Sequence, residues 1–202
     1  MRYFVTGIDT GIGKSVASAV LVKMLEAAYW KPVQSGLEDE TDSEFIKRVV
    51  PKSKVFPETY RLKTPASPHL AAKIDGKNIQ LSDFKIPESN SLIIEGAGGL
   101  LVPLNEKQTI LNLIQYLNIP VIIVSKNYLG SINHTLLTAY CLKSNQIPVK
   151  GILFNGQENE ESERIICQMS QLPHLGRIDE AEQINKEFIK KQAQKLKTYW
   201  NQ

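Results

Sequence analysis

Glycine, lysine and hydroxyl residues are concentrated near the beginning of the chain, in the run GIDTGIGKS at residues 7–15. Closely spaced glycines let several backbone N–H groups point at one phosphate, and a helix that begins there adds its positive N-terminal end. Lys14 would supply a cation for a transferred phosphate, and the Ser15 hydroxyl could bind Mg²⁺. Because a strand-like stretch precedes the run and a helical pattern follows it, the sequence predicts a nucleotide phosphate-binding loop.

The glycine spacing of this loop differs from the common form G-x-x-x-x-G-K-S/T. That form would place a glycine at position 8, where the chain has Ile8, and the glycine lies at position 7 instead. The alternative interpretation is therefore a Gly-Lys-Ser triplet that follows a strand by chance. The flanking strand, the helix and the motifs described next favour the phosphate loop.

A carboxylate at the end of an apolar run is the second chemical group. Residues 92–99 read LIIEGAGG, so Glu95 ends a strand and glycines follow it at once. Open α/β sheets bind ligands at the carboxyl ends of their strands, where an acidic residue can hold Mg²⁺. The glycines would let the backbone come close to that ligand. Taken alone, a glutamate at a strand end is more often a surface residue.

Lys31 lies in the run KPVQSG at residues 31–36, at the end of the second apolar strand. A lysine among apolar residues is costly unless its charge is used or reaches solvent. Together with Lys14 it would bring two cations to one pocket, which suits an anionic substrate beside a triphosphate. Asp42 follows soon after, where it could cap a helix or bind the metal, and the residues alone favour the cap.

Short apolar runs that alternate with amphipathic stretches must position these groups. The expected strands are residues 3–6, 29–33, 91–95, 121–125 and 149–154, and the expected helices are residues 14–28, 42–50, 109–117, 131–144, 158–171 and 181–197. The strands are apolar on both faces, as in a parallel sheet that helices cover. This alternation predicts a single-domain, doubly wound α/β fold with a mostly parallel sheet and helices on both faces. Residues 51–90 are rich in proline and show no long periodic segment, and such a stretch is usually functional.

The composition is that of an ordinary globular protein, with 202 residues of which 42% are hydrophobic and 22% charged. The net charge of +3 is too small to indicate nucleic-acid binding, and the lysines of the last helical pattern are spread as on a solvated face. No apolar run approaches the roughly 18 residues that span a bilayer, and no signal-peptide pattern opens the chain. Cys141 and Cys167 are expected to be free, buried thiols, so we expect a cytoplasmic protein that binds neither nucleic acid nor membrane.

Taken together, these motifs resemble those of the dethiobiotin synthetase family, which belongs to the P-loop NTPase superfamily. The resemblance rests on residues 3–10 with 13–15, on KPVQSG at 31–36, PASPH at 65–69, EGAGG at 95–99 and LGSINH at 129–134, followed by Leu137 and Thr138. Their order and spacing match the family over residues 1–155. No single motif is specific by itself, but the set is.

The resemblance implies a ligase of biotin biosynthesis that uses MgATP to carboxylate 7,8-diaminopelargonate with CO₂ or bicarbonate, giving dethiobiotin, ADP and phosphate. One amine would take up CO₂ as a carbamate, whose oxygen attacks the γ-phosphate to form a carbamic–phosphoric anhydride. The second amine would then displace phosphate and close the ureido ring. Phosphoryl transfer needs positioning and charge neutralisation more than covalent catalysis, so the scheme requires no nucleophile–base pair.

The resemblance also implies the roles of individual residues. Lys31, Lys14 and Thr10 would be catalytic, while Ser15, Asp42 and Glu95 would hold Mg²⁺, which reverses the preference for Asp42 as a cap. The nucleotide would be bound by Gly11, Ile12, Gly13, Lys14, Ser15, Val16, Asp42, Glu95, Gly98 and Asn155. The substrate would be bound by Thr10, Lys31, Ser35, Pro68, Gly98, Gly99, Gly130 and Asn133. In the family, the helix that Gly130 and Asn133 begin reaches the neighbouring subunit, so the resemblance implies a homodimer with substrate sites at its interface.

Three departures from the family pattern concern the nucleotide. The family often has an acidic residue at the position of Gly11, an aspartate at that of Gly156, and Gly-x-Ile-Pro where residues 175–179 read LGRID. We therefore expect weaker adenine discrimination, with the triphosphate supplying most of the affinity. His69 and His134 are expected to make structural hydrogen bonds, although Pro68 and His69 are expected near the substrate.

Two other functions are compatible with a phosphate loop. A partition-type ATPase switch carries a second lysine early in the loop, and this chain has Asp9 at the equivalent position. A non-catalytic nucleotide-binding module would not require the second buried cation that Lys31 is expected to supply. Both alternatives are therefore less favoured than the synthetase.

Overall fold

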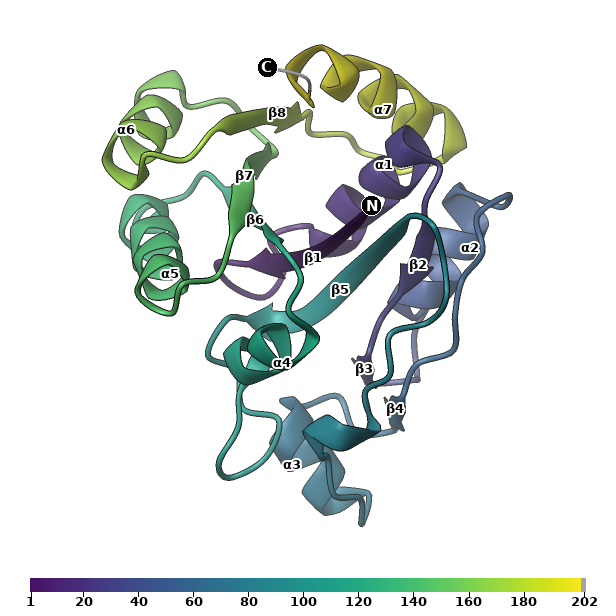
Figure 1. Ribbon diagram of the computed structural model, residues 1–202. Coiled ribbons are helices and arrows are strands. Elements are labelled where there is room, and N and C mark those ends of the chain that lie inside the picture. The colour runs from purple at the N-terminus through teal and green to yellow at the C-terminus, as the bar shows by residue number, and fades with distance from the viewer. Residues whose placement is uncertain (201–202) are drawn as a thin grey trace.

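Six parallel strands form the central sheet of the computed structural model, which describes residues 1–200 (Figure 1). Their order in the sheet is β2-β5-β1-β6-β7-β8, and every neighbouring pair is parallel. The strands are Arg2–Gly7 (β1), Ala28–Trp30 (β2), Leu92–Gly99 (β5), Val121–Lys126 (β6), Val149–Asn155 (β7) and His174–Ile178 (β8). The predicted α/β fold with a parallel sheet is therefore confirmed.

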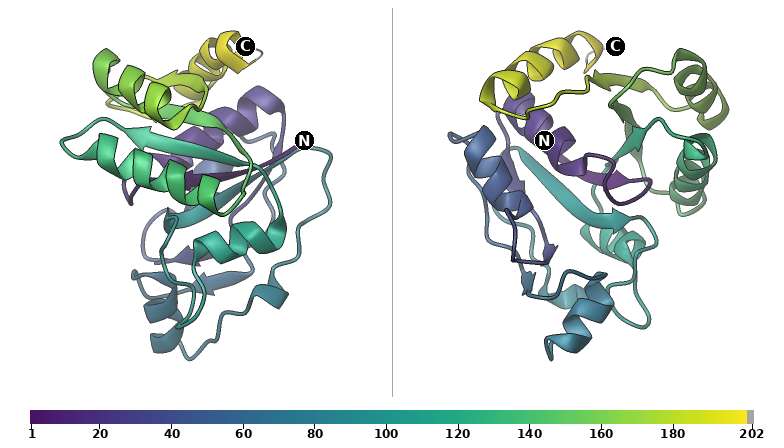
Figure 2. Two further views of the ribbon diagram at one scale, coloured as in Figure 1. Left: turned by 60° about the vertical axis from the view of Figure 1, so that its left-hand side comes forward. Right: turned by 180° about the vertical axis from the view of Figure 1, so that it is seen from behind.

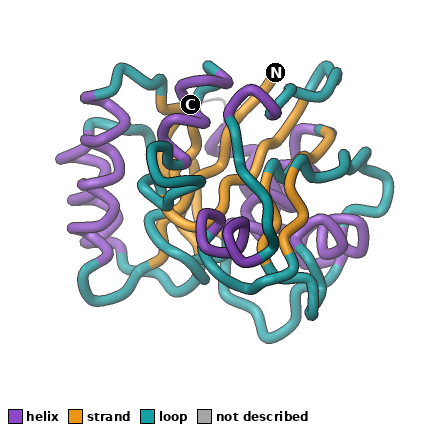
Figure 3. The backbone as a smooth tube through the Cα atoms, turned by 90° about the horizontal axis from the view of Figure 1, so that it is seen from below, coloured by secondary structure: helices purple, strands orange, loops and turns teal. Residues whose placement is uncertain are grey.

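Helices cover both faces of this sheet, and the strands run between them through the middle of the molecule (Figures 2 and 3). They are Lys14–Leu25 (α1), Asp42–Val49 (α2), Pro68–Ile74 (α3), Ile110–Leu117 (α4), Ser131–Ser144 (α5), Glu160–Ser170 (α6) and Lys186–Trp200 (α7). Because successive strand residues point to opposite faces, Ile94 packs in one core layer with α4, α5 and α6. Ile93 packs in the other layer with α1, α2 and α7.

The strand predicted at residues 29–33 is divided in two at Lys31 and Pro32. β2 ends at Trp30, and β3 (Val33–Ser35) leaves the main sheet to pair in parallel with β4 (Tyr60–Leu62). Pro32 has no N–H group and cannot continue the hydrogen bonds of a sheet, but its carbonyl accepts from Tyr60 N at 3.0 Å. The break leaves Lys31 directly after β2, at the carboxyl end of that strand.

Residues 51–90 contain more regular structure than the sequence pattern indicated. They include β4, α3 and a 3₁₀-helix at Leu81–Asp83. Pro68 is the first residue of α3, a position that tolerates proline because the first N–H groups of a helix have no partner within it. Elements this short do not show a measurable periodicity, which is why the pattern did not reveal them.

Several predicted boundaries are wrong by a few residues, and β8 was not predicted. β8 is a five-residue strand at the edge of the sheet that contains Gly176, which weakens any strand signal. α1 ends at Leu25 instead of 28 because Glu26 adopts a left-handed backbone with φ of 50°. α7 begins at Lys186 instead of 181, and it packs beside α1 (Figure 1).

No helix within residues 1–200 is long and apolar enough to cross a membrane. Cys141 and Cys167 are free, as expected, but both are only half-buried, so the prediction of buried thiols is wrong. Most lysines of α7 are exposed, as predicted for a solvated helix face.

Candidate active site

The phosphate loop connects the end of β1 to the beginning of α1. Gly7 is the last residue of β1, and α1 begins at Lys14 directly after Gly13. A Cβ atom on Gly7 would lie 2.8 Å from Ile12 Cδ1, and one on Gly13 would lie 2.1 Å from Asn155 Nδ2. The unusual glycine at position 7 therefore has a steric reason, because a larger residue there would collide with the loop itself.

Lys14 folds back over this loop. Its Nζ donates to the Asp9 carbonyl at 2.8 Å, and the residue is almost completely buried. Burial lowers the pKa of Lys14, although the nearby Glu95 carboxylate opposes the shift. The ammonium group is thus held inside the loop by one main-chain carbonyl, a hydrogen bond that a phosphate oxygen can replace.

Ser15, Lys31, Asp42 and Glu95 meet close to the point where β2 ends. Lys31 Nζ lies 2.6 Å from Asp42 Oδ2 and 3.0 Å from Glu95 Oε1. Ser15 Oγ is within hydrogen-bond distance of Asp42 Oδ1, and it lies 3.1 Å from Glu95 Oε1. We call these four residues the acidic cluster. It brings two carboxylates, a hydroxyl and an ammonium together beside Lys14, the second cation.

Burial and ion pairing act in opposite directions on the charges of the acidic cluster. Burial alone would lower the pKa of Lys31, which is 5% exposed, but the attraction of Glu95 and Asp42 outweighs burial and raises that pKa. Burial would likewise raise the pKa of Asp42, but Lys31 holds it below its ordinary value. Lys31 and Asp42 therefore both carry their charges at neutral pH.

Thr41, and not Asp42, caps α2. Thr41 Oγ1 accepts from Glu44 N at 3.3 Å, and Glu44 Oε2 accepts from Thr41 N at 2.9 Å, which is the reciprocal pair of a capping box. Asp42 is the first residue of the helix, so its carboxylate is free to turn toward Ser15 and Lys31. The interpretation of Asp42 as the cap is wrong, although the T-x-x-E signal of the true cap is visible at residues 41–44.

A cavity of about 650 Å³ opens over the acidic cluster, and we call it the polar cavity. Its volume lies within the usual range of small-molecule sites. The predicted site residues that line it are Thr10, Gly11, Gly13, Lys14, Ser15, Val16, Lys31, Ser35, Asp42, Pro68, Glu95 and Gly98. Most of the predicted nucleotide and substrate residues thus share one cavity.

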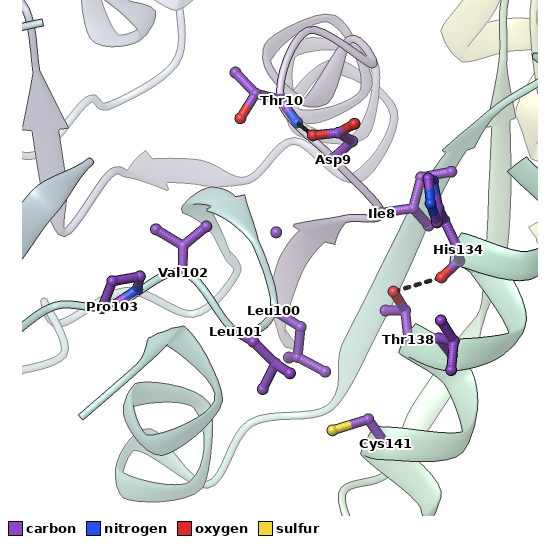
Figure 4. Close-up of a pocket in the computed structure, with 12 residues that line it drawn as sticks. Ile8, Asp9, Thr10, Leu100, Leu101, Val102, Pro103, His134, Thr138 and Cys141 are labelled. Atoms are coloured by element: carbon purple, nitrogen blue, oxygen red, sulfur yellow. Dashed lines mark hydrogen bonds between the residues drawn. The ribbon is translucent and has the colours of Figure 1, made fainter. Parts of the chain in front are cut away.

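A second cavity, of about 490 Å³, adjoins the polar cavity, since Thr10 and Val102 line both. Figure 4 shows it lined by the phosphate loop, by residues 99–103 and by one side of α5. Most of its lining is apolar, including Ile8, Leu101 and Leu137, and we call it the apolar cavity. A charged cavity that continues into an apolar one suits a ligand with a polar reactive end and an aliphatic chain.

Comparison with known proteins identifies the family. A family model described as an AAA domain matches residues 1–187. The ATP-dependent dethiobiotin synthetase of Brucella ovis is 51% identical over 180 residues, which cover 88% of this chain and 85% of that protein. The ATP-dependent dethiobiotin synthetase of Rhodopseudomonas palustris is 50% identical over 177 residues, which cover 86% of this chain and 83% of that protein. This chain belongs to the ATP-dependent dethiobiotin synthetase family. The resemblance that the motifs indicated is confirmed.

Solved structures extend the comparison beyond the dethiobiotin synthetase family. A plasmid partition protein of Borrelia burgdorferi superposes with a TM-score of 0.61 at 14% identity, over 99% of this chain and 97% of that one. The septum site-determining protein of Pyrococcus horikoshii, complexed with Mg-ADP, superposes with a TM-score of 0.53 at 14% identity, over 98% of this chain and 90% of that one. At such low identity the likeness concerns the fold alone, so it does not favour the partition-type alternative.

Some predicted residues of the dethiobiotin synthetase site lie outside the polar cavity. The Ile12 side chain is buried in the core. Gly99 lines the apolar cavity instead. Gly130 and Asn133 lie exposed at the beginning of α5 and line neither of the two cavities. Their predicted role in substrate binding is therefore not explained by either cavity of the single chain.

The histidines and Pro68 differ in position. Pro68 is buried and lines the polar cavity, whereas His69 is exposed, lines a different hollow beside α3 and pairs with Ser67 Oγ at 3.0 Å. His134 Nδ1 pairs with Tyr128 OH at 2.7 Å on the rim of the apolar cavity. Both histidines thus make hydrogen bonds, as predicted. Of the neighbours Pro68 and His69, only Pro68 lines the polar cavity.

Asn155, which was predicted to bind the nucleotide, and Asp179, which lies in the segment that departs from the family pattern, both make contacts within the protein. Asn155 Nδ2 donates to the Ile12 carbonyl at 2.8 Å. Asp179 accepts from Gln192 Nε2 at 3.0 Å and from Lys195 Nζ at 2.5 Å, so its carboxylate faces α7. The weak discrimination of adenine stays a prediction.

Tyr29 and Gln34 are site residues that the sequence patterns did not reveal. Tyr29 OH donates to Glu95 Oε2 at 2.9 Å, and burial together with Glu95 raises the pKa of Tyr29 well above its ordinary value. Gln34 lines the polar cavity next to Ser35. Gln34 Oε1 and Ser35 Oγ are buried and have no hydrogen-bond partner within residues 1–200, so a ligand contact by Ser35 would require its side chain to turn.

Proposed function

We propose that this chain works as a dethiobiotin synthetase, which carboxylates 7,8-diaminopelargonate with CO₂ and MgATP and closes the ureido ring. The observation that carries this proposal is the buried Lys31 ammonium, which shares the polar cavity with Lys14 of the phosphate loop. A buried cation is costly unless it is paired with an anion, and Asp42 and Glu95 pair with Lys31 in this structure. If these carboxylates bind the metal of MgATP, Lys31 needs another anion, and a carbamate beside the triphosphate is such an anion. Because ATP is the phosphate donor, we place the reaction in the cytoplasm.

The proposed reaction begins when one amine of the diamine adds to CO₂ and forms a carbamate with loss of a proton. A carbamate oxygen attacks the γ-phosphorus, ADP leaves, and a carbamic–phosphoric anhydride results. The second amine attacks the carbonyl carbon, phosphate leaves with the bridging oxygen, and the ring closes. The protein's task is to hold two anions together, which Lys14, Lys31 and Thr10 are positioned to do at one cavity.

The acidic cluster has the donor set that a magnesium ion prefers. Mg²⁺ is commonly bound by one or two carboxylates together with substrate phosphates and water. Here the Ser15 hydroxyl lies within hydrogen-bond distance of both the Asp42 and the Glu95 carboxylates. We propose that these three residues hold the metal of bound MgATP. When bound, the metal neutralises charge that develops on the transferred phosphoryl group.

Lys31 is bound by the same two carboxylates, Asp42 and Glu95, in this structure. These oxygens cannot fully neutralise both the lysine and a metal ion. We therefore expect Lys31 to exchange at least one carboxylate for the anionic carbamate when MgATP binds. Lys31 would then be available for the substrate only when the phosphoryl donor is in place.

The apolar cavity is the proposed site of the substrate's aliphatic chain. It meets the polar cavity at Thr10, so the amines could lie near Lys31, Gly98 and Ser35 while the chain lies along residues 99–103. The carboxylate tail requires N–H donors, and the exposed beginning of α5, at Gly130 and Asn133, could supply them from a second copy of the chain.

A homodimer is the assembly that this arrangement requires. Leu101, Leu129 and Leu137 are all more than half exposed around the apolar cavity and the beginning of α5. Exposed apolar groups of this kind gather at protein interfaces. We propose that two copies bury these leucines against each other and bring the N-terminus of α5 from each subunit to the apolar cavity of the other.

Phosphate release from MgATP tests the proposed function. Purified protein should release phosphate and form dethiobiotin only when 7,8-diaminopelargonate and bicarbonate are both present. Omitting either should return phosphate release to the background rate. Phosphate release that is independent of the diamine would instead support an ATPase switch and refute the synthetase.

A further inference from the structure

Tyr29 reaches the acidic cluster from the protein core. It is fully buried, and its hydroxyl donates to Glu95 Oε2 at 2.9 Å. The other oxygen of the same carboxylate, Glu95 Oε1, lies 3.0 Å from Lys31 Nζ and 3.1 Å from Ser15 Oγ. The two oxygens of Glu95 therefore face different neighbours, one inward to a phenol and one outward to the polar cavity.

The register of the sheet places the Tyr29 hydroxyl under Glu95. β2 and β5 are parallel, with Tyr29 opposite Ile93, so Glu95 lies two residues farther along the neighbouring strand and on the same face. The backbone of Tyr29 is fixed on its other side, because its N–H donates to the Lys54 carbonyl at 2.8 Å and its carbonyl accepts from Phe56 N at 2.9 Å. The phenol thus has little freedom to move away from the carboxylate.

Packing alone does not require the hydroxyl group. A phenylalanine would fill nearly the same core volume, whereas a buried hydroxyl is costly unless it has a hydrogen-bond partner. A glutamate carboxylate also has a soft terminal torsion and can rotate unless a neighbour holds it. The hydrogen bond from Tyr29 restricts this rotation and occupies Oε2.

We propose that Tyr29 is a positioning residue that holds Oε2 of Glu95, so that Oε1 alone is presented to the polar cavity and to the metal of bound MgATP. This inference rests on the metal-binding role proposed above for Glu95. Mg²⁺ demands near-ideal geometry from its oxygen ligands, whereas Ca²⁺ accepts irregular geometry and two-oxygen contacts from one carboxylate. Fixing one oxygen therefore favours Mg²⁺ over Ca²⁺.

The test compares Tyr29→Phe with the unchanged protein by titration calorimetry of Mg²⁺ and Ca²⁺ in the presence of a non-hydrolysable ATP analogue. We expect the affinity for Mg²⁺ to fall by about tenfold or more, as is typical when a group that orients a metal ligand is lost. The affinity for Ca²⁺ should fall much less, so the Mg²⁺/Ca²⁺ ratio should decrease. Binding of the analogue without metal should not change.

Tyr60→Phe is the matched control. Tyr60 is also a buried tyrosine that donates its hydroxyl to a carboxylate, that of Asp83, but it does not line the polar cavity. Both variants should lose thermal stability, and only Tyr29→Phe should change the Mg²⁺/Ca²⁺ ratio. Equal losses for both metals, or a ratio like that of Tyr60→Phe, would overturn the positioning role. Absence of metal binding in the unchanged protein would instead refute the metal site on which this inference rests.

Discussion

Replacing Lys31 with methionine keeps an unbranched side chain of similar length but removes the charge that joins Asp42 to Glu95. The Lys31 ammonium lies 2.6 and 3.0 Å from these carboxylates, and Glu95 is 1% exposed. Removing one partner of a buried ion pair costs about 3–5 kcal/mol. Because the Asp42 side chain is 25% exposed and Ser15 still contacts it, we expect the lower end, about 3 kcal/mol.

The loss of Lys31 should appear in both thermal stability and turnover. For a chain of this size, about 3 kcal/mol corresponds to a decrease of roughly 6–12 °C in Tm. Losing one preorganised electrostatic contact to the reacting anion should lower kcat by about 10²–10³, whereas the KM for ATP should change little because the phosphate loop is intact. Differential scanning fluorimetry and phosphate release measure the two effects.

The response of the variant to MgATP distinguishes loss of the Lys31 charge from simple damage to the core. If the metal of MgATP lies between the two carboxylates, it neutralises the charge that Lys31→Met exposes. A non-hydrolysable MgATP analogue should then raise the Tm of the variant by more than it raises that of the unchanged protein. The same substitution at Lys23, which is exposed on α1, should have almost no effect. An analogue-induced gain that is equal in both proteins, or turnover within fivefold of the unchanged protein, would refute the reasoning.

Three further predictions concern other parts of the molecule. Turnover with GTP or CTP should lie within about a hundredfold of turnover with ATP, because Asn155 is engaged with the loop backbone. A hundredfold corresponds to about 2.7 kcal/mol of base recognition, and a larger gap in steady-state rates would show that the base is read. Leu137→Arg should convert the proposed homodimer to inactive monomers in sedimentation velocity, while the same change at Met169, which is also about half exposed, should not. A Leu137→Arg dimer would exclude this face as the interface. Burial acts to raise the pKa of Glu163, but the hydrogen bonds with His174 and Asn127 and the charge of Arg177 together outweigh burial and lower that pKa. The stabilisation is therefore present above the unfolded pKa of about 4.3 and is lost as pH falls through the folded pKa. Glu163→Gln should therefore be less stable than the unchanged protein in urea at pH 7, with a gap that narrows below about pH 4; a constant gap would contradict this linkage.

The main elements of the fold were predictable because their sequence signals are local. Each buried strand of the sheet's centre is a short apolar run, and the phosphate loop lies between a strand and a helix that both show clear patterns. The failures have physical causes. Pro32 ended the pairing of β2 with β5 and redirected the chain into β3, while Glu26 ended α1 through a left-handed backbone that helix propensity does not reveal.

The candidate site was less predictable, because its geometry depends on which strands are neighbours. Glu95 and Tyr29 touch only because β2 lies beside β5, which is more than sixty residues away in the sequence. Nothing in either run reveals that contact. Thr41 is different, since its capping signal with Glu44 is visible in the sequence and would have freed Asp42 for the acidic cluster.

The fate of an oxygen atom tests the central claim most directly. In the proposed reaction, one carbamate oxygen becomes the bridging atom of the anhydride and leaves with phosphate. With ¹⁸O-labelled CO₂, 7,8-diaminopelargonate and MgATP, mass spectrometry should therefore find one labelled oxygen in each phosphate released and equal amounts of ADP and dethiobiotin. Unlabelled phosphate, or phosphate formed without dethiobiotin, would contradict the proposed attack of a carbamate on the γ-phosphate.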